Sequence, residues 1–151
     1  MYSLYTVFCC FILLFYILST AVDATDMPFL NAYLDSVGAP SFQKGCNFAA
    51  AGSTILPATK YSVSPFSFGI QVAQFFRFKN QVLQLQTKGT YFLLAGKKIR
   101  KYIPQVDYFD QGLYMFDIGQ NDLAGAFYSK TEDQVIASIP KILSDFESGL
   151  K

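Results

Sequence analysis

Gly112-Leu-Tyr-Met-Phe-Asp-Ile118 is an almost continuous apolar run with the length of one β-strand, and Gly119-Gln-Asn-Asp122 follows it directly. A run of this kind is typical of a strand that is buried on both faces, as in a parallel sheet covered by helices. In such sheets the loops at the carboxyl ends of the strands carry the chemistry. The sequence therefore predicts a central strand here, with a candidate site in the polar residues after it.

A second apolar run lies earlier in the chain. Cys46-Asn-Phe-Ala-Ala-Ala51 is short and ends at Gly52-Ser-Thr54, which predicts a short buried strand that runs into a loop. The next residues, 55–65, include Pro57, Pro65 and several Ser and Thr residues, so we expect them to form a loop.

Other segments have the periodicity of helices. Met27–Ser36 carries apolar residues at helical spacing, and Ser67–Leu85 is amphipathic with Ser67 as a candidate N-cap. Thr131-x-x-Gln134 is a capping box that predicts the start of a third helix, which Pro140 is expected to kink or open. The apolar face of that helix is predicted to consist of Val135, Ile136, Ile139, Leu143 and Phe146. Strands that alternate with helices predict a layered α/β fold.

The composition excludes several classes of protein. The chain has 151 residues, enough for one modest domain, and its 52% of hydrophobic residues is too high for a disordered segment. A formal net charge of +1 argues against a nucleic-acid partner held by phosphate neutralisation. Because there are no histidines, the chain alone cannot complete a Ser-His-Asp triad, a Cys-His dyad or a histidine-bearing metal site.

The N-terminus has the pattern of a secretory leader. Val7–Leu18 is an unbroken apolar run with the length of a signal-peptide core, and small residues suit cleavage after Ala24. We therefore expect residues 1–24 to be a leader, residues 25–151 to be the domain, and the mature protein to be secreted. Since no Lys or Arg precedes the run, two alternatives stay open: an uncleaved membrane anchor, and sequence that is not a native leader but a result of truncation.

Two further features, a basic segment and a cysteine, are candidates for chemistry. Gln86–Lys101 holds five of the twelve basic residues and no acid, which suits either an anionic surface or, more simply, a solvated loop. Cys46 is the only cysteine outside the apolar leader, where Cys9 and Cys10 lie, and we expect it to be a small buried hydrophobe. The cysteines form no zinc-binding pattern, so we expect neither a metal nor a cofactor.

Two motifs, in this order, resemble conserved blocks of the plant GDSL-type esterases/lipases of the SGNH hydrolase superfamily. Gly45-Cys-Asn-Phe-Ala-Ala-Ala-Gly52 resembles the second block, G-x-N-F-A-x-x-G, and Gly119-Gln-Asn-Asp122 resembles the third, G-x-N-D. The resemblance covers nearly all of residues 26–151 except Gln86–Lys101. It implies an α/β fold of the family type, a three-layer α/β/α sandwich with a mostly parallel sheet, of which this chain would hold an incomplete part.

The resemblance also implies a function, which is hydrolysis of small carboxylic esters or acylated substrates through a serine nucleophile and an oxyanion hole. By resemblance, Gly52 supplies a backbone N–H to that hole and Asn121 supplies a side-chain N–H. A glycine lets the backbone approach the oxyanion closely, and a carboxamide that follows a rigid strand is aimed before the reaction. The structural alternative is that Gly52 is a turn glycine and that Asn121 and Asp122 cap a loop or helix.

The family's other blocks are absent from the sequence. It contains neither G-D-S, which carries the nucleophilic serine, nor D-x-x-H, which carries the acid and the base. We therefore expect a partial ester hydrolase that is inactive by itself, with no nucleic-acid partner and no stable membrane span once the leader is removed. The alternative is a non-catalytic secreted binding protein that retains part of the hydrolase fold.

Overall fold

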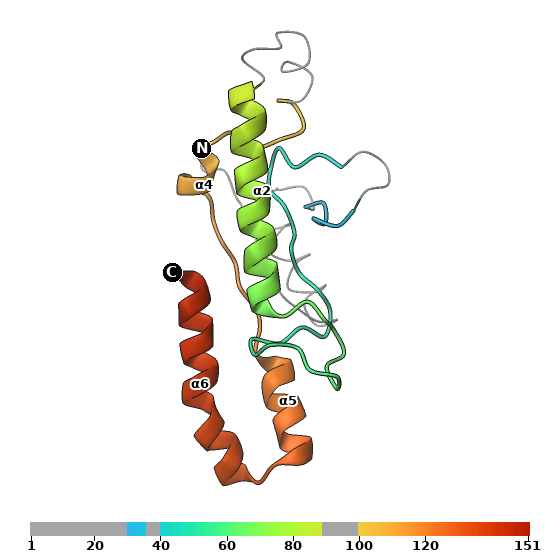
Figure 1. The fold of residues 1–151 in the computed structure, drawn as a ribbon, viewed down its shortest axis with the longest axis vertical. Coiled ribbons are helices and arrows are strands. Elements are labelled where there is room, and N and C mark those ends of the chain that lie inside the picture. The colour runs from blue at the N-terminus through green and yellow to red at the C-terminus, as the bar shows by residue number, and fades with distance from the viewer. Residues whose placement is uncertain (1–29, 36–39, 89–99) are drawn as a thin grey trace, which may run out of the picture.

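The computed structural model describes residues 30–35, 40–88 and 100–151. Helices dominate these ranges (Figure 1), and they are α2 (Phe68–Lys88), α4 (Tyr108–Gln111), α5 (Gln120–Ser129) and α6 (Glu132–Leu150). The long helix α2 forms the axis of the molecule, while α5 and α6 pair with each other near its N-terminal end. Between α4 and α5 the chain runs alongside α2 as an irregular segment, residues 112–119.

The predicted amphipathic helix is confirmed as α2. The helix follows Ser67, whose carbonyl accepts a hydrogen bond of 3.1 Å from the Gln71 N–H, as expected of the residue at the N-cap position. Its buried side chains recur at helical spacing and are Phe68, Gln71, Phe78 and Val82. The main core and helix α6 both pack against this buried face.

The main core forms where the second apolar run meets α2. Cys46 and Phe48 pack against Phe78 and Val82 of α2 and against Phe109 of α4. The rings of Phe48 and Phe78 meet edge-on, with centroids 5.9 Å apart, which is a favourable aromatic geometry. The expectation that Cys46 is a buried hydrophobe is confirmed, because its exposed fraction is 2%.

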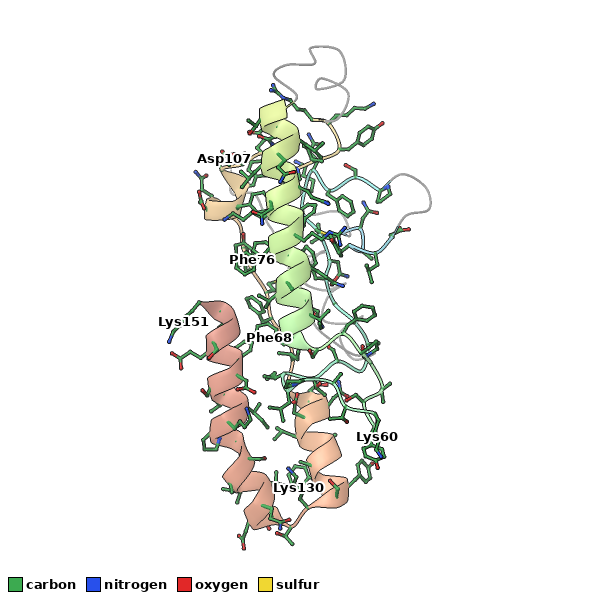
Figure 2. The ribbon with its side chains drawn as sticks, in the orientation of Figure 1. Lys60, Phe68, Phe76, Asp107, Lys130 and Lys151 are labelled. Atoms are coloured by element: carbon green, nitrogen blue, oxygen red, sulfur yellow. The ribbon has the colours of Figure 1, made fainter. Side chains whose placement is uncertain are left out.

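A second aromatic cluster fixes α6 to α2. The Phe68 ring at the start of α2 lies 5.1 Å from the Phe146 ring of α6 and 5.9 Å from the Phe116 ring, centroid to centroid. Figure 2 shows Phe68 at the place where α2 faces α6. The cluster thus joins α2, α6 and the segment 112–119 directly above the start of α5.

Neither of the two predicted strands, Cys46–Ala51 and Gly112–Ile118, is seen in the described residues. The only strand-like pairing there is an isolated parallel bridge between Ala32 and Asn47. In it the Tyr33 N–H donates to the Asn47 carbonyl at 2.7 Å, and the Asn47 N–H donates to the Asn31 carbonyl at 2.9 Å. Residues 112–118 pair with no other described segment, and a strand needs a neighbour to complete its ladder. The expected three-layer sandwich is therefore not seen in this part of the chain.

Two more expectations about local structure are wrong. Within Met27–Ser36 the described residues, 30–35, form the bridge and a turn instead of a helix. The residues after Gly119 were expected to be a loop, but α5 begins at Gln120. In contrast, residues 55–65 form turns and bends, as predicted.

Helix α6 begins as predicted and buries only part of the predicted apolar face. Both hydrogen bonds of the Thr131–Gln134 capping box are present, and the helix continues through Pro140 without interruption. Of that face, Val135 is buried and Phe146 packs on Phe68, while Ile136, Ile139 and Leu143 are exposed. Ile142, outside the predicted face, is also buried. The predicted leader and most of Gln86–Lys101 lie outside the described residues. Within the described ranges, none of the helices has the length and apolar character needed to cross a membrane.

Candidate active site

The two motifs found in the sequence meet in the structure. The Asn121 side chain, in the first turn of α5, donates a hydrogen bond of 2.8 Å from Nδ2 to the Ser53 carbonyl. Ser53 directly follows Gly52 and has no exposed surface. The structure therefore brings Asn121 next to Gly52, although the two motifs are far apart in the sequence.

Asp122 makes a second connection between the same two segments. Its Oδ2 accepts a hydrogen bond of 2.8 Å from the Ile55 N–H, and its Oδ1 accepts one of 2.9 Å from the Leu56 N–H. The carboxylate is buried, with 8% of the residue exposed. Hydrogen bonds to an ionised acceptor are shorter and stronger than neutral ones. Both carboxylate oxygens are thus used to hold the loop that follows Gly52.

The backbone geometry at residue 119 explains why a glycine lies just before Asn121 and Asp122. Gly119 is the N-cap of α5 and has φ +108°, a conformation that side chains rarely adopt. A Cβ at this position would lie 3.2 Å from Cδ1 of Ile55, the residue whose N–H Asp122 binds. Gly119 therefore allows both the sharp turn into α5 and the close approach of the loop. In the first turn of α5, the Asp122 carboxylate is also favoured by the helix dipole.

Gly52 is equally constrained. It has φ +76°, and a Cβ there would lie 2.8 Å from Cγ1 and 2.9 Å from Cβ of Val63. Among the described residues, no oxygen accepts a hydrogen bond from the Gly52 N–H. A residue with a side chain would change both the backbone conformation and the approach of Val63, so the position requires glycine.

The loop is also tied to the start of α2. The Thr54 carbonyl accepts a hydrogen bond of 2.8 Å from the Phe68 N–H, so the first turn of α2 binds the loop directly. Residues Ser53–Leu56 are consequently fixed from two sides, by α2 and by α5. Rigid support of this kind is what a group needs if it is to be aimed before a reaction begins.

The sequence identified Gly52 and Asn121 but missed the role of Asp122. Asp122 is the last residue of the G-x-N-D motif, so the motif pointed to it. From the sequence, however, its only expected role was to cap a loop or helix. Gly52 and Asn121 follow the two segments that were predicted as strands, and neither segment is a paired strand here. The assignment of Gly52 and Asn121 to an oxyanion hole stays a prediction. No cluster of metal-ligating side chains occurs in the described ranges.

Within the described part of the chain, the two apolar grooves of largest volume lie along α2, and neither is lined by Gly52 or Asn121. The larger has a volume of about 690 Å³ and lies between α2 and the segments around Tyr33, Phe42 and Ile103. The smaller, of about 300 Å³, lies between α2 and the C-terminal end of α6. Neither groove identifies the substrate of the candidate site.

Comparison with known proteins agrees with the family resemblance of the two sequence motifs. Residues 19–151 match the family described as GDSL-like Lipase/Acylhydrolase. The Arabidopsis thaliana protein named GDSL esterase/lipase At1g54790 is 63% identical over 130 residues, which cover 86% of this chain and 30% of that protein. GDSL esterase/lipase At3g05180 of the same plant is 51% identical over 130 residues, or 86% of this chain and 32% of the relative.

A further relative is named as a fucosidase and not as an esterase. The Arabidopsis thaliana protein named Alpha-L-fucosidase 3 is 40% identical over 134 residues, which cover 85% of this chain and 34% of that protein. The chain thus spans about a third of the length of these curated relatives. No solved structure matches the chain.

Proposed function

Because the chain belongs to the GDSL-like lipase/acylhydrolase family, we propose that it supplies the oxyanion-hole part of a hydrolase that cleaves carboxylic esters. The family resemblance read from the two motifs is confirmed, and the family fold is of the α/β class. We further propose that Cys46–Ala51 and Gly112–Ile118 occupy strand positions of a three-layer sandwich in that fold.

The observation that carries the proposal is the 2.8 Å hydrogen bond between Asn121 Nδ2 and the Ser53 carbonyl. It holds the Asn121 carboxamide beside the residue that follows Gly52, so two groups that the motifs mark as donors become neighbours. Attack on an ester carbonyl places negative charge on its oxygen, and fixed N–H donors stabilise that charge without having to reorganise. In this proposal the Gly52 N–H and the Asn121 side chain are those donors.

A complete reaction also needs a nucleophile and a base. The 151 residues contain no histidine and no G-D-S motif, so these two groups have to come from other segments of the family fold. In the proposed reaction a serine attacks the ester carbonyl, a base takes the serine proton, and the oxyanion forms against Gly52 and Asn121. We expect the chain alone to show no ester hydrolysis above that of a denatured control.

The proposal is tested in a chimera with the relative that is 63% identical. The 130 aligned residues of that relative are replaced by those of this chain, and hydrolysis of p-nitrophenyl esters is compared with that of the unaltered relative. We expect an active chimera in which Asn121→Ala (numbered as here) lowers kcat by roughly 100- to 1,000-fold. A p-nitrophenyl fucoside is included, because another relative is named as a fucosidase.

The control variant is Asn80→Ala, which makes the same chemical change at an exposed position of α2. It is expected to leave kcat unchanged. An active chimera in which Asn121→Ala and Asn80→Ala behave alike would overturn the oxyanion assignment. A folded but inactive chimera would favour the alternative, a non-catalytic binding protein with a hydrolase-like scaffold.

Secretion is a separate part of the proposal. We propose that residues 1–24 are a signal peptide, on the basis of the apolar run Val7–Leu18 and the small residues before Thr25. The full chain is expressed in plant cells, and the protein in the medium is subjected to N-terminal sequencing. We expect Thr25 as its first residue, whereas retention in the membrane fraction with an intact N-terminus would show an anchor.

A further inference from the structure

We propose that Asp122 is the positioning residue of this site, an inference that rests on the proposed oxyanion function of Gly52 and Asn121. Asp122 does not act on the substrate in this account. Its carboxylate sets the distance between the loop that carries Gly52 and the helix that carries Asn121.

The geometry of the carboxylate carries the inference. Its two oxygens accept hydrogen bonds from consecutive backbone N–H groups, those of Ile55 and Leu56, at 2.8 and 2.9 Å. Two parallel bonds fix the direction of the loop as well as its distance, which a single bond does not do. Because Asp122 directly follows Asn121 in α5, the same helical turn holds the loop at Ser53, Ile55 and Leu56.

Burial makes these two bonds strong. Asp122 is 8% exposed, so water competes poorly for its oxygens, and the first turn of α5 favours its negative charge. Loss of one oxygen would leave a buried N–H without its acceptor, which is costly. The loop would then relax away from α5, and Gly52 would move relative to Asn121.

An alternative reading is that Asp122 only stabilises the fold. The two readings differ in what they predict for the reaction. A purely stabilising residue changes the melting temperature, while kcat of the folded enzyme stays the same. A positioning residue changes kcat at a constant KM, because it alters the transition-state contact and leaves ground-state binding in place.

The chimera described above provides the test, with Asp122→Asn, Asp122→Glu and the control Asp107→Asn. Asp107 is exposed, makes no side-chain cap bond, and lies at the N-cap of α4, far from α5 (Figure 2). We expect Asp122→Asn to lower kcat by about 100-fold at an unchanged KM, the size of effect that a misplacement of about 1 Å produces. Asp122→Glu keeps two acceptor oxygens and should retain more of kcat than Asp122→Asn, while Asp107→Asn should match the parent chimera.

The possible outcomes separate the two proposals. If Asn121→Ala lowers kcat but Asp122→Asn does not, the positioning role is overturned and the oxyanion assignment stands. If Asn121→Ala has no effect in an active chimera, the oxyanion assignment itself fails. Equal kcat for Asp122→Asn and Asp122→Glu, or a change in KM alone, would also overturn the positioning role.

A second measurement on the full 151-residue chain does not depend on activity. Hydrogen exchange of the peptide that contains Ile55 and Leu56 is followed by mass spectrometry in the parent chain and in Asp122→Asn. We expect faster exchange in this peptide, with no change in peptides from the middle of α2. Unchanged exchange at Ile55 and Leu56 would show that Asp122 does not hold the loop.

Discussion

Gly149, in the last turn of α6, lies so close to the Phe68 ring that a Cβ at this position would overlap Cε1 of Phe68 and lie 3.0 Å from its Cδ1. The close approach lets the C-terminal end of α6 pack onto the start of α2, from which the Phe68 N–H also binds the candidate site loop. This glycine therefore determines how closely two helices meet next to the site.

The contact predicts opposite effects for two glycine substitutions. Gly149→Ala should lower the free energy of unfolding by about 1–3 kcal/mol, because the added methyl group overpacks the Phe68 contact. Gly125→Ala in α5 should raise it by about 0.5–1 kcal/mol, since nothing lies within 4 Å of the new Cβ and alanine favours the helix. Urea unfolding of both variants measures the difference, and a stabilising Gly149→Ala would contradict the packing described.

Stability at alkaline pH should depend on Tyr114. Burial, with a smaller contribution from the Asp110 carboxylate, raises the pKa of Tyr114 to about 12 from its ordinary value of 10.0. Its hydroxyl also donates a hydrogen bond of 2.8 Å to the Phe109 carbonyl. Between these two pH values the unfolded chain loses the phenolic proton first, so the stability that Tyr114 contributes is full below pH 10.0 and declines up to about pH 12.

Melting temperatures measured from pH 8 upwards test this dependence. We expect Tyr114→Phe to be less stable than the parent at pH 8 and to lose less stability as the pH rises. Tyr128→Phe is the control, because Tyr128 is 94% exposed, and it should follow the parent at every pH. Parallel curves for the parent and Tyr114→Phe would show that Tyr114 does not contribute.

The Cys46 thiol should be unreactive in the folded chain. Burial raises the pKa of Cys46 well above its ordinary value, and the side chain lies within the aromatic core. The thiolate is the reactive form, so iodoacetamide at pH 8 should leave Cys46 unmodified in native protein and modify it in urea. Peptide mass spectrometry measures the modification, with an exposed cysteine introduced by Ser144→Cys as the positive control. Rapid native modification of Cys46 would contradict the core assignment.

We expect the chain to self-associate through exposed apolar side chains of its C-terminal helices. On α5 and α6 several large apolar side chains are exposed, and they include Leu123, Phe127, Ile136 and Leu143. Exposed apolar surface of this kind is unusual for a soluble monomer and promotes association. We expect concentration-dependent association in sedimentation velocity, reduced by the double variant Ile136→Lys/Leu143→Lys.

The matched control for this experiment is Ala137→Lys/Ser144→Lys. It adds the same charge at the same spacing on exposed positions of α6 that carry small side chains. If both double variants reduce association equally, net charge is responsible and the apolar side chains are not.

Helices were predictable from the sequence where their signals are local. The apolar periodicity of Ser67–Leu85 and the Thr131–Gln134 capping box act within a few residues of each other, and both α2 and the start of α6 were predicted. Helix α5 was missed because Gly119 suggested a loop, whereas Gly119, at positive φ, is the N-cap from which α5 starts. The continuous course of α6 through Pro140 was also missed, since that proline lies on the exposed side.

Strands and buried faces depend on distant residues and were harder to predict. The apolar composition of Gly112–Ile118 predicted a strand, but a ladder requires a partner, and none of the other described segments provides one. The face that α6 buries depends on where Phe68 and Phe116 lie, which the spacing within α6 cannot reveal. In the site, the motifs predicted the proximity of Gly52 and Asn121, but the two bonds of Asp122 became visible only in the structure.

In the proposed reaction, Gly52 and Asn121 together bind the oxyanion of an ester. The most direct test is a crystal structure of the active chimera after reaction with a fluorophosphonate, whose phosphonyl oxygen takes the place of that oxyanion. We expect this oxygen to lie about 2.7–3.1 Å from both the Gly52 nitrogen and Asn121 Nδ2. A phosphonyl oxygen more than about 3.5 Å from either atom, or bound by other donors, would contradict it.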